Sequence, residues 1–250
     1  MSRPLVVFTD DTVHPAAAEK LRETCELKIL PGSYPDEALL SETCASASAI
    51  LARMGVVTRK VIESSPQLRI IARHGIGVDA VDLDAATEHG IPVTTTGSIN
   101  AGAVAEYAFA MLLGLARKIP EAHESMRRGA WSRENLIGYE LAGKTMGIIG
   151  LGAIGTFVAR QALGFRMNVV AQDPVARPPA DLDIEMTDRA DLLARSDVVS
   201  LHMRLTEDTR RTLDAKSIAQ LKPGVLIVNT ARGELIDEAA LIDGLRSGHV

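Results

Sequence analysis

The 250-residue sequence is poor in cysteine, in aromatic residues and in net positive charge. Cys25 and Cys44 are its two cysteines, and no C-x-x-C spacing occurs, which argues against a disulfide framework or a zinc site and favours a reducing cytoplasm. The net charge is -5 and aromatic residues make up 3% of the chain. We therefore expect a soluble globular protein without a basic surface stripe, without a metal and with no nucleic-acid partner.

Long apolar runs are also missing. The longest membrane-like stretch, Ala108 to Ala116, is far shorter than the roughly 20 apolar residues that a spanning helix needs. We interpret it as a buried helix and expect no membrane partner. The chain enters Leu5 to Thr9 without a charged leader followed by an apolar run, so we also expect no secretion signal.

Short β-branched apolar runs alternate with amphipathic segments along the whole sequence, a pattern typical of parallel strands covered by helices on both faces. We predict an α/β protein with two doubly wound parallel sheets, a flavodoxin-like domain over residues 1–99 and a Rossmann domain over 100–250. The expected strands are Leu5–Thr9, Glu26–Leu30, Ala49–Ala52, Leu68–Ala72, Ile91–Thr94, Thr145–Ile149, Met167–Gln172, Asp197–His202 and Val225–Asn229. The expected helices include His14–Glu23, Leu83–Glu88 closed by Gly90, and a long helix from Ala101 to Ala116 that Pro120 breaks or restarts.

A glycine-rich turn carries the strongest local signal. Gly150-Leu151-Gly152-Ala153-Ile154-Gly155 follows the strand Met146–Ile149 and opens a helix expected over Thr156–Leu163. In this context Gly150 permits a tight turn, Gly152 lets backbone approach a pyrophosphate, and Gly155 lets the helix pack on the strand. The alternative is a turn whose glycines serve packing alone.

Asp173 ends the next expected strand, at the distance from the glycines where an acid binds the adenosine ribose hydroxyls. A carboxylate there repels a 2′-phosphate and favours NAD over NADP. Two alternatives stay open: Asp173 starts a turn at Asp173-Pro174, or the nearby Arg177 receives a phosphate.

Several segments together resemble the D-isomer-specific 2-hydroxyacid dehydrogenases. They are LRIIARHGIGVDAVDLD (68–84), GIPVTTTGSINAGAVAE (90–106), ELAGK (140–144), SDVVSLHMRLTEDTR (196–210) and LKPGVLIVNTARGELIDEAAL (221–241). The resemblance implies that 1–99 is the substrate domain and that 100–250 binds NAD. It also implies hydride transfer between a 2-hydroxy acid and a 2-oxo acid, in a homodimer. The apolar helix around Phe109 to Leu115 could contribute to the dimer contact, although burial within one subunit would explain its composition as well.

The resemblance assigns roles to particular residues. Gly75, Ile76 and Gly77 match the turn whose N–H groups hold the substrate carboxylate, although a plain strand-to-helix turn would look the same. Arg232 matches the catalytic arginine, which can grip a carboxylate bidentately and polarise the 2-oxo group, whereas an arginine after a strand is otherwise usually solvated. The cofactor contacts that match are Thr230 and Ala231 at the nicotinamide and Ala153 and Ile154 at the pyrophosphate.

Two histidines attract attention without matching a catalytic motif. His202 lies within an expected strand, and we interpret it as structural or cofactor-adjacent. Met203-Arg204 follows it where the family commonly has any residue followed by proline. This chain therefore departs from the family pattern where the backbone passes the adenosine. His74 precedes the glycine turn, where it could line a cleft, although a packed or solvated histidine is favoured.

The proton-transfer pair of the family, a histidine oriented by a glutamate, normally lies downstream of Val250. We therefore expect either a fragment of a longer enzyme or a non-catalytic, NAD(H)-sensing relative. The chain as written is expected to turn over substrate poorly. Within the family, Trp131 to Leu141 favours the phosphoglycerate-dehydrogenase-like members.

Overall fold

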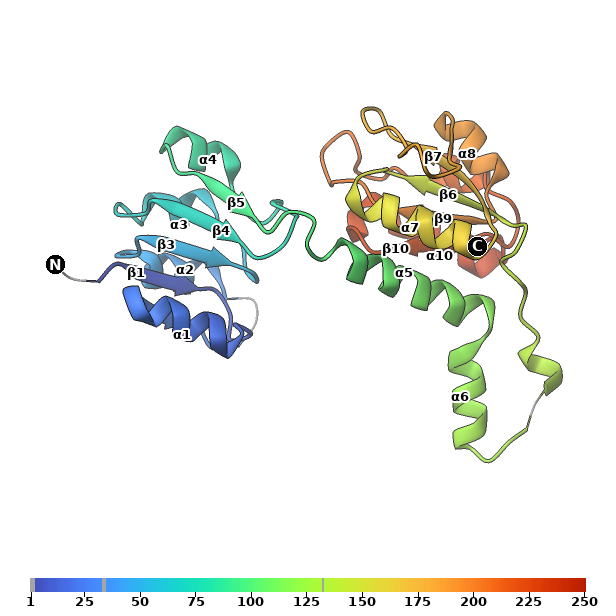
Figure 1. Cartoon of the computed structure of the whole chain (residues 1–250), viewed down its shortest axis with the longest axis horizontal. Helices are drawn as coiled ribbons and strands as arrows, with labels where there is room; N and C mark the ends of the chain where they lie inside the picture. The colour runs from blue at the N-terminus through green and yellow to red at the C-terminus, as the bar shows by residue number, and fades with distance from the viewer. Residues whose placement is uncertain (1–2, 33–34, 132) are drawn as a thin grey trace. The chain divides into compact units, whose positions relative to one another are not determined.

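The computed structural model describes residues 3–32, 35–131 and 133–250. The chain divides into two compact units, Met1–Ile99 and Asn100–Val250 (Figure 1). Each unit contains its own five-stranded parallel sheet with helices. The predicted α/β class with two doubly wound sheets is therefore confirmed.

The first unit has the flavodoxin-like strand order. Its sheet runs β2-β1-β3-β4-β5, all parallel, so the order reverses between β1 and β3. The strands are β1 (Leu5–Phe8), β2 (Glu26–Ile29), β3 (Ala49–Ala52), β4 (Ile70–Arg73) and β5 (Val93–Thr95).

Local sequence signals place the helices of the first unit, which are α1 (Pro15–Thr24), α2 (Glu37–Cys44), α3 (Arg59–Glu63) and α4 (Leu83–Glu88). Asp36 and Asp82 accept the backbone N–H of the third helical residue of α2 and α4, which satisfies a donor that the helix leaves unpaired. Gly90 has a φ of +65° and ends α4, as the sequence predicts. The core includes Val7, Ile50 and Ile71 from the central strands, each with no exposed surface.

The second unit has a Rossmann-type order, β10-β9-β6-β7-β8, again all parallel. The chain builds β6, β7 and β8 outward on one side and then crosses over to β9 and β10, so the switch point lies between β6 and β9. The strands are β6 (Thr145–Ile149), β7 (Asn168–Gln172), β8 (Glu185–Met186), β9 (Val198–Leu201) and β10 (Leu226–Asn229). The helices are α5 (Ala101–Ala116), α6 (Ile119–Arg127), α7 (Ala153–Gly164), α8 (Arg189–Arg195), α9 (Ala215–Ala219) and α10 (Glu238–Ser247), with short 3-10 turns at Arg133–Leu136 and Gly233–Leu235.

Helix α5 packs one face into the core of the second unit, beside α7. Phe109 and Leu112 are buried, whereas Tyr107 and Leu115 on the same helix are more than half exposed. Lys118 adopts a left-handed φ of +51°, and α6 restarts at once with Pro120 in its first turn, where a missing N–H costs nothing. Across the ranges that the structure describes, no helix is long and apolar enough to span a membrane.

Several details of the second unit differ from the sequence prediction. His202 was expected inside a strand, but β9 ends at Leu201 and His202 follows it. Helix α7 begins at Ala153, three residues before the expected start, so Gly155 lies inside its first turn. Strand β8 was not predicted, because it is two residues long and is defined only by its pairing with Val170 and Ala171 of β7. A strand held by its neighbour rather than by its own apolar pattern leaves no local signal.

Candidate functional site

The glycine loop leaves the end of β6 at the switch point of the second sheet. Gly150 has a φ of +95°, and its N–H donates to the carbonyl of Gln172 at 2.9 Å. A Cβ at Gly150 would lie 2.7 Å from the carbonyl carbon of His202 and 2.8 Å from the nitrogen of Met203. Both the left-handed φ and the contact with the chain after β9 therefore require glycine here.

The other two glycines differ in what surrounds them. A Cβ at Gly155 would lie 2.1 Å from the carbonyl oxygen of Gly150, because the first turn of α7 packs directly on the loop. A Cβ at Gly152 would meet no atom within 4 Å. Gly152 is the N-cap residue of α7, followed by Ala153 and Ile154, whose N–H groups have no acceptor within the helix. This open, donor-rich helix start is suited to an anion.

Asp173 follows β7 and connects its own turn to the glycine loop. Its Oδ2 accepts the N–H of Leu151 at 2.8 Å, and its Oδ1 accepts those of Val175 and Ala176 at 2.9 and 2.7 Å. Burial alone would raise the pKa of this carboxyl, but the three backbone donors and Arg177 outweigh it and hold the pKa below its usual value. Asp173 is therefore ionised at neutral pH, and it builds the turn that the sequence offered as an alternative role.

The nearby arginine is engaged with the same turn. Nη1 of Arg177 donates to the carbonyl oxygens of Val175 and Ala176, at 3.3 and 2.9 Å. A guanidinium held in this way has fewer donors to offer a 2′-phosphate, and the ionised Asp173 stands beside it. The local charge pattern thus favours a ribose hydroxyl over a phosphate.

The loop after β10 carries the predicted arginine. Asn229 Oδ1 accepts the N–H of Ala231 at 3.0 Å, and Asn229 Nδ2 donates to the carbonyl oxygen of Arg232 at 2.7 Å. Nη1 of Arg232 donates to the carbonyl oxygen of Ala231 at 2.8 Å. Thr230 Oγ1 is buried and has no hydrogen-bond partner among the described residues. Sequence reasoning assigned no role to Asn229, although an asparagine at a strand end is a common turn former.

His202 lies at the same edge, directly after β9. Its N–H donates to Ile149 at 2.8 Å, and its Nε2 is 2.8 Å from Ser200 Oγ. Burial lowers the pKa of His202 from its ordinary 6.5 to about 4, so the ring is neutral at physiological pH. Its backbone is what Gly150 packs against.

The carboxyl ends of parallel strands meet at one edge of a sheet, and here that edge gathers the predicted second-unit residues. β6 contributes the glycine loop, β7 contributes Asp173, and β10 contributes the Thr230–Arg232 segment. Neighbouring strands lie about 4.8 Å apart, so the spread from β7 to β10 is on the order of 15 Å. Ligands of doubly wound sheets bind at this edge, across the switch point.

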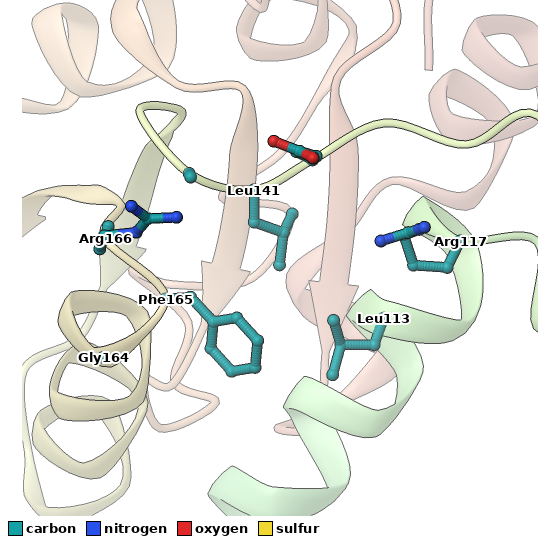
Figure 2. Close-up of a pocket in the computed structure, with 8 residues that line it drawn as sticks. Leu113, Arg117, Leu141, Gly164, Phe165 and Arg166 are labelled. Atoms are coloured by element: carbon teal, nitrogen blue, oxygen red, sulfur yellow. The ribbon is translucent and has the colours of Figure 1, made fainter.

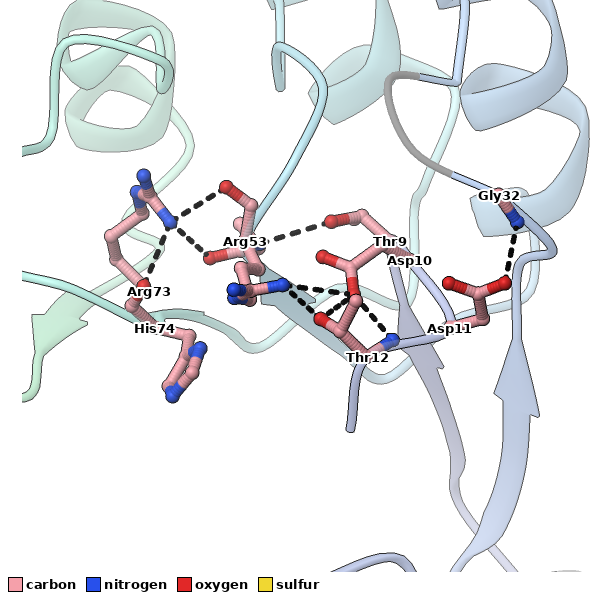
Figure 3. A network of polar contacts seen from close by, with 9 residues as sticks. Thr9, Asp10, Asp11, Thr12, Gly32, Arg53, Arg73 and His74 are labelled. Atoms are coloured by element: carbon pink, nitrogen blue, oxygen red, sulfur yellow. Dashed lines mark hydrogen bonds and ion pairs between the residues drawn. The ribbon is translucent and has the colours of Figure 1, made fainter. Parts of the chain in front are cut away.

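The Gly75-Ile76-Gly77 turn belongs to the first unit, where the half-buried Arg73 holds it. Gly75 has a φ of +146°. Nε of Arg73 donates to the carbonyl oxygen of Gly77 at 3.0 Å, and its Nη1 donates to the carbonyls of Ala52, Arg53 and His74 (Figure 3). Sequence reasoning missed Arg73, although a charged residue ending an apolar strand was visible.

A second charged group lies at the same edge of the first sheet. Asp10 is fully buried after β1, and Arg53, after β3, approaches it with Nη1 3.5 Å from Oδ1. Thr12 also donates to Asp10, and Arg53 donates to Thr12 (Figure 3). Burial would raise the pKa of Asp10, but the Thr12 and Arg53 donors outweigh it and lower that pKa. The edge therefore places two arginines and one buried carboxylate beside a glycine turn, whose backbone N–H groups can bind an anion.

A pocket of about 290 Å³ lies elsewhere on the second unit (Figure 2). Its lining combines Leu113, Leu141 and Phe165 with Arg117 and Arg166, and it contains none of the predicted site residues. It adjoins the C-terminal end of α7, whereas the glycine loop adjoins the N-terminal end. In the described part of the chain, no group of three or more histidine, cysteine, aspartate or glutamate side chains is placed to hold a metal.

The Rossmann-type sheet and its glycine loop define a dinucleotide-binding protein, and comparison with known proteins narrows the class. The sequence model of one protein family, described as the D-isomer specific 2-hydroxyacid dehydrogenase, NAD binding domain, matches residues 109–250. The D-3-phosphoglycerate dehydrogenase of Mycobacterium bovis is 42% identical over 253 residues, covering 100% of this chain and 47% of that protein. The hydroxypyruvate reductase of Thermotoga maritima is 41% identical over 244 residues, covering 98% of this chain and 79% of that protein.

A solved structure agrees with these relatives. The D-lactate dehydrogenase of Aquifex aeolicus, complexed with NAD and lactic acid, matches with a TM-score of 0.87 and 30% identity, covering 98% of this chain and 74% of that one. The chain belongs to the D-isomer-specific 2-hydroxyacid dehydrogenase family and carries its NAD-binding domain. The resemblance inferred from sequence is thus confirmed, as is NAD as the cofactor. The chain spans about half the length of the phosphoglycerate dehydrogenases that it matches.

Proposed function

We propose that this protein is an NAD-dependent oxidoreductase that interconverts a 2-hydroxy acid and a 2-oxo acid by hydride transfer. The observation that carries the proposal is the gathering of the glycine loop, Asp173 and Arg232 at one edge of the second sheet. A dinucleotide cradle beside an arginine supplies both requirements of this reaction, a place for the cofactor and a group that binds carboxylate.

The residues present fit the cofactor. The open space at Gly152 admits a pyrophosphate, and the N–H groups of Ala153 and Ile154 face the same helix start. Asp173 is ionised, and we assign it to the ribose hydroxyls. We assign Gly150 and Gly155 to the shape of the loop. Thr230 and Ala231 are assigned to the nicotinamide side. When bound, NAD supplies the hydride acceptor that protein side chains lack.

Arg232 is assigned to the substrate. A planar guanidinium can donate two parallel N–H bonds to a carboxylate and its neighbouring 2-oxo oxygen, which draws electron density from the carbon that receives hydride. A lysine presents a point charge and cannot reproduce this fork. The Gly75-Ile76-Gly77 turn of the first unit is assigned to the substrate carboxylate, with backbone N–H groups as donors.

The test is turnover by the complete gene product. With NADH, we expect consumption of hydroxypyruvate or pyruvate; with NAD, we expect oxidation of D-lactate or D-3-phosphoglycerate and no oxidation of L-lactate, which serves as the matched control. Binding of NADH without turnover of any of these acids would instead favour the NAD(H)-sensing alternative. Failure to bind NADH would refute both.

We further propose a homodimer in a cytoplasmic location. Tyr107, Leu115, Ile119 and Met126 on α5 and α6 are each more than half exposed, and a partner subunit would cover them. Phe109 is buried within the unit, so the face of α5 that a partner could contact is the one that carries Tyr107 and Leu115. Cys25 and Cys44 are free thiols, which suits a reducing compartment. A monomeric mass by light scattering would refute the dimer.

A further inference from the structure

The turn that carries Arg232 is closed by a ring of three hydrogen bonds. Asn229 Oδ1 accepts the N–H of Ala231 at 3.0 Å. The carbonyl oxygen of Ala231 in turn accepts Nη1 of Arg232 at 2.8 Å. The carbonyl oxygen of Arg232 accepts Nδ2 of Asn229 at 2.7 Å, which returns the ring to its start. The guanidinium is therefore linked, through the Ala231 peptide, to the side-chain amide of Asn229.

That amide is itself fixed by the sheet. Asn229 is the last residue of β10 and pairs in register with Leu201 of β9, whose side chain has no exposed surface. Its backbone is thus held in the sheet by pairing with β9, while its side chain bonds to the loop that follows. A group mounted on a strand transmits the position of that strand more faithfully than a group mounted on a loop.

We propose that Asn229 is a positioning residue for Arg232, an inference that rests on the proposed function of that arginine. Asn229 orients the guanidinium through the Ala231 peptide. The competing description is that Asn229 only ends the strand in an ordinary turn. The two differ in one respect: a positioning residue loses its effect once the planar fork that it positions is gone.

A double-mutant cycle separates them. The variants are Asn229→Ala, Arg232→Lys and the double variant, made in the complete gene product. The binding probe is oxalate in the presence of saturating NADH, because its adjacent carboxylates offer a guanidinium fork the same pair of oxygens as a 2-oxo acid. The matched control is Asn168→Ala, which removes another amide-to-carbonyl hydrogen bond, from Nδ2 to the carbonyl of Gly143 at 3.2 Å. Asn168 is the first residue of β7, so it lies at the amino ends of the strands, away from Arg232.

We expect Asn229→Ala to weaken oxalate binding and lower kcat/KM by about 10- to 100-fold, the scale of a misplaced reacting group. In the Arg232→Lys background the same change should alter oxalate binding and kcat/KM by no more than about twofold. Asn168→Ala should leave oxalate binding within about twofold of the native value.

An equal loss of oxalate affinity from Asn229→Ala in both backgrounds would overturn the inference. Absence of oxalate binding by the native protein would also overturn it. Turnover tests the proposed function separately: oxalate binding with a non-additive cycle but no reaction of any 2-oxo acid would refute the enzyme and leave the positioning role intact.

Discussion

The three glycines of the loop after β6 should respond differently to the same added methyl group. At Gly152 the backbone has φ -70° and ψ -163°, which alanine adopts readily, and no atom lies within 4 Å of the new Cβ. Gly152→Ala should therefore change the free energy of unfolding by less than about 1 kcal/mol, as the loss of a glycine N-cap offsets the reduced chain entropy. The methyl group would nevertheless stand where we propose that the pyrophosphate binds.

NADH binding should reveal that conflict. Losing one hydrogen bond to a charged oxygen costs about 1.5–3 kcal/mol, so we expect NADH to bind about 10- to 100-fold more weakly to Gly152→Ala. The control is Gly155→Ala, whose Cβ would lie 2.1 Å from the carbonyl oxygen of Gly150. Overpacking of this kind should lower the stability by about 1–3 kcal/mol.

Thermal unfolding and fluorescence titration with NADH measure the two effects independently. Unchanged NADH affinity in Gly152→Ala would refute the pyrophosphate site, and native stability in Gly155→Ala would refute the close packing of α7 on the loop.

Three further perturbations test the site. Asp173→Ser should narrow the preference for NADH over NADPH and lower the melting temperature, because three backbone N–H groups lose their acceptor; equal affinities of the native protein for both cofactors would contradict the assignment. Arg232→Lys should reduce turnover by orders of magnitude with little change in NADH affinity, and near-normal turnover would remove Arg232 from the mechanism. The pKa of His202 is about 4 when folded and 6.5 when unfolded, so the unfolded state binds more protons between these values and stability should fall as the pH drops through this window, by at most about 3 kcal/mol. His202→Gln should weaken this dependence of stability on pH. If urea titrations at several pH values give both proteins the same change of unfolding free energy with pH, His202 is not its source.

Much of the fold could be predicted because its signals are local. Every strand except β8 was predicted to within a few residues, since most of them have their own apolar run and β2 alternates apolar with charged residues. Turn chemistry marked the end of α4 at Gly90 and the restart at Pro120. The motif from Gly150 to Gly155 needed only its order along the chain. These features depend on what a short segment does by itself.

The sequence could not show how residues far apart along the chain share one hydrogen bond or one contact. Asp173 was assigned to a ribose, yet its Oδ2 also holds Leu151, a contact that exists only because β6 and β7 are neighbours. Arg73 looked like the end of a strand, and its role in holding Gly77 depends on how the chain turns back over it.

By itself the sequence determined the α/β class, the two sheets, the glycine loop and the family, because periodicity, turn residues and motif order are properties of short segments. Only the tertiary structure shows why a side chain at Gly150 would clash. Its Cβ would meet the backbone of His202 and Met203, which the pairing of β6 with β9 brings alongside. The tertiary structure also gave Asn229 its part, because a ring of hydrogen bonds depends on where backbone groups point and residue order does not encode that direction.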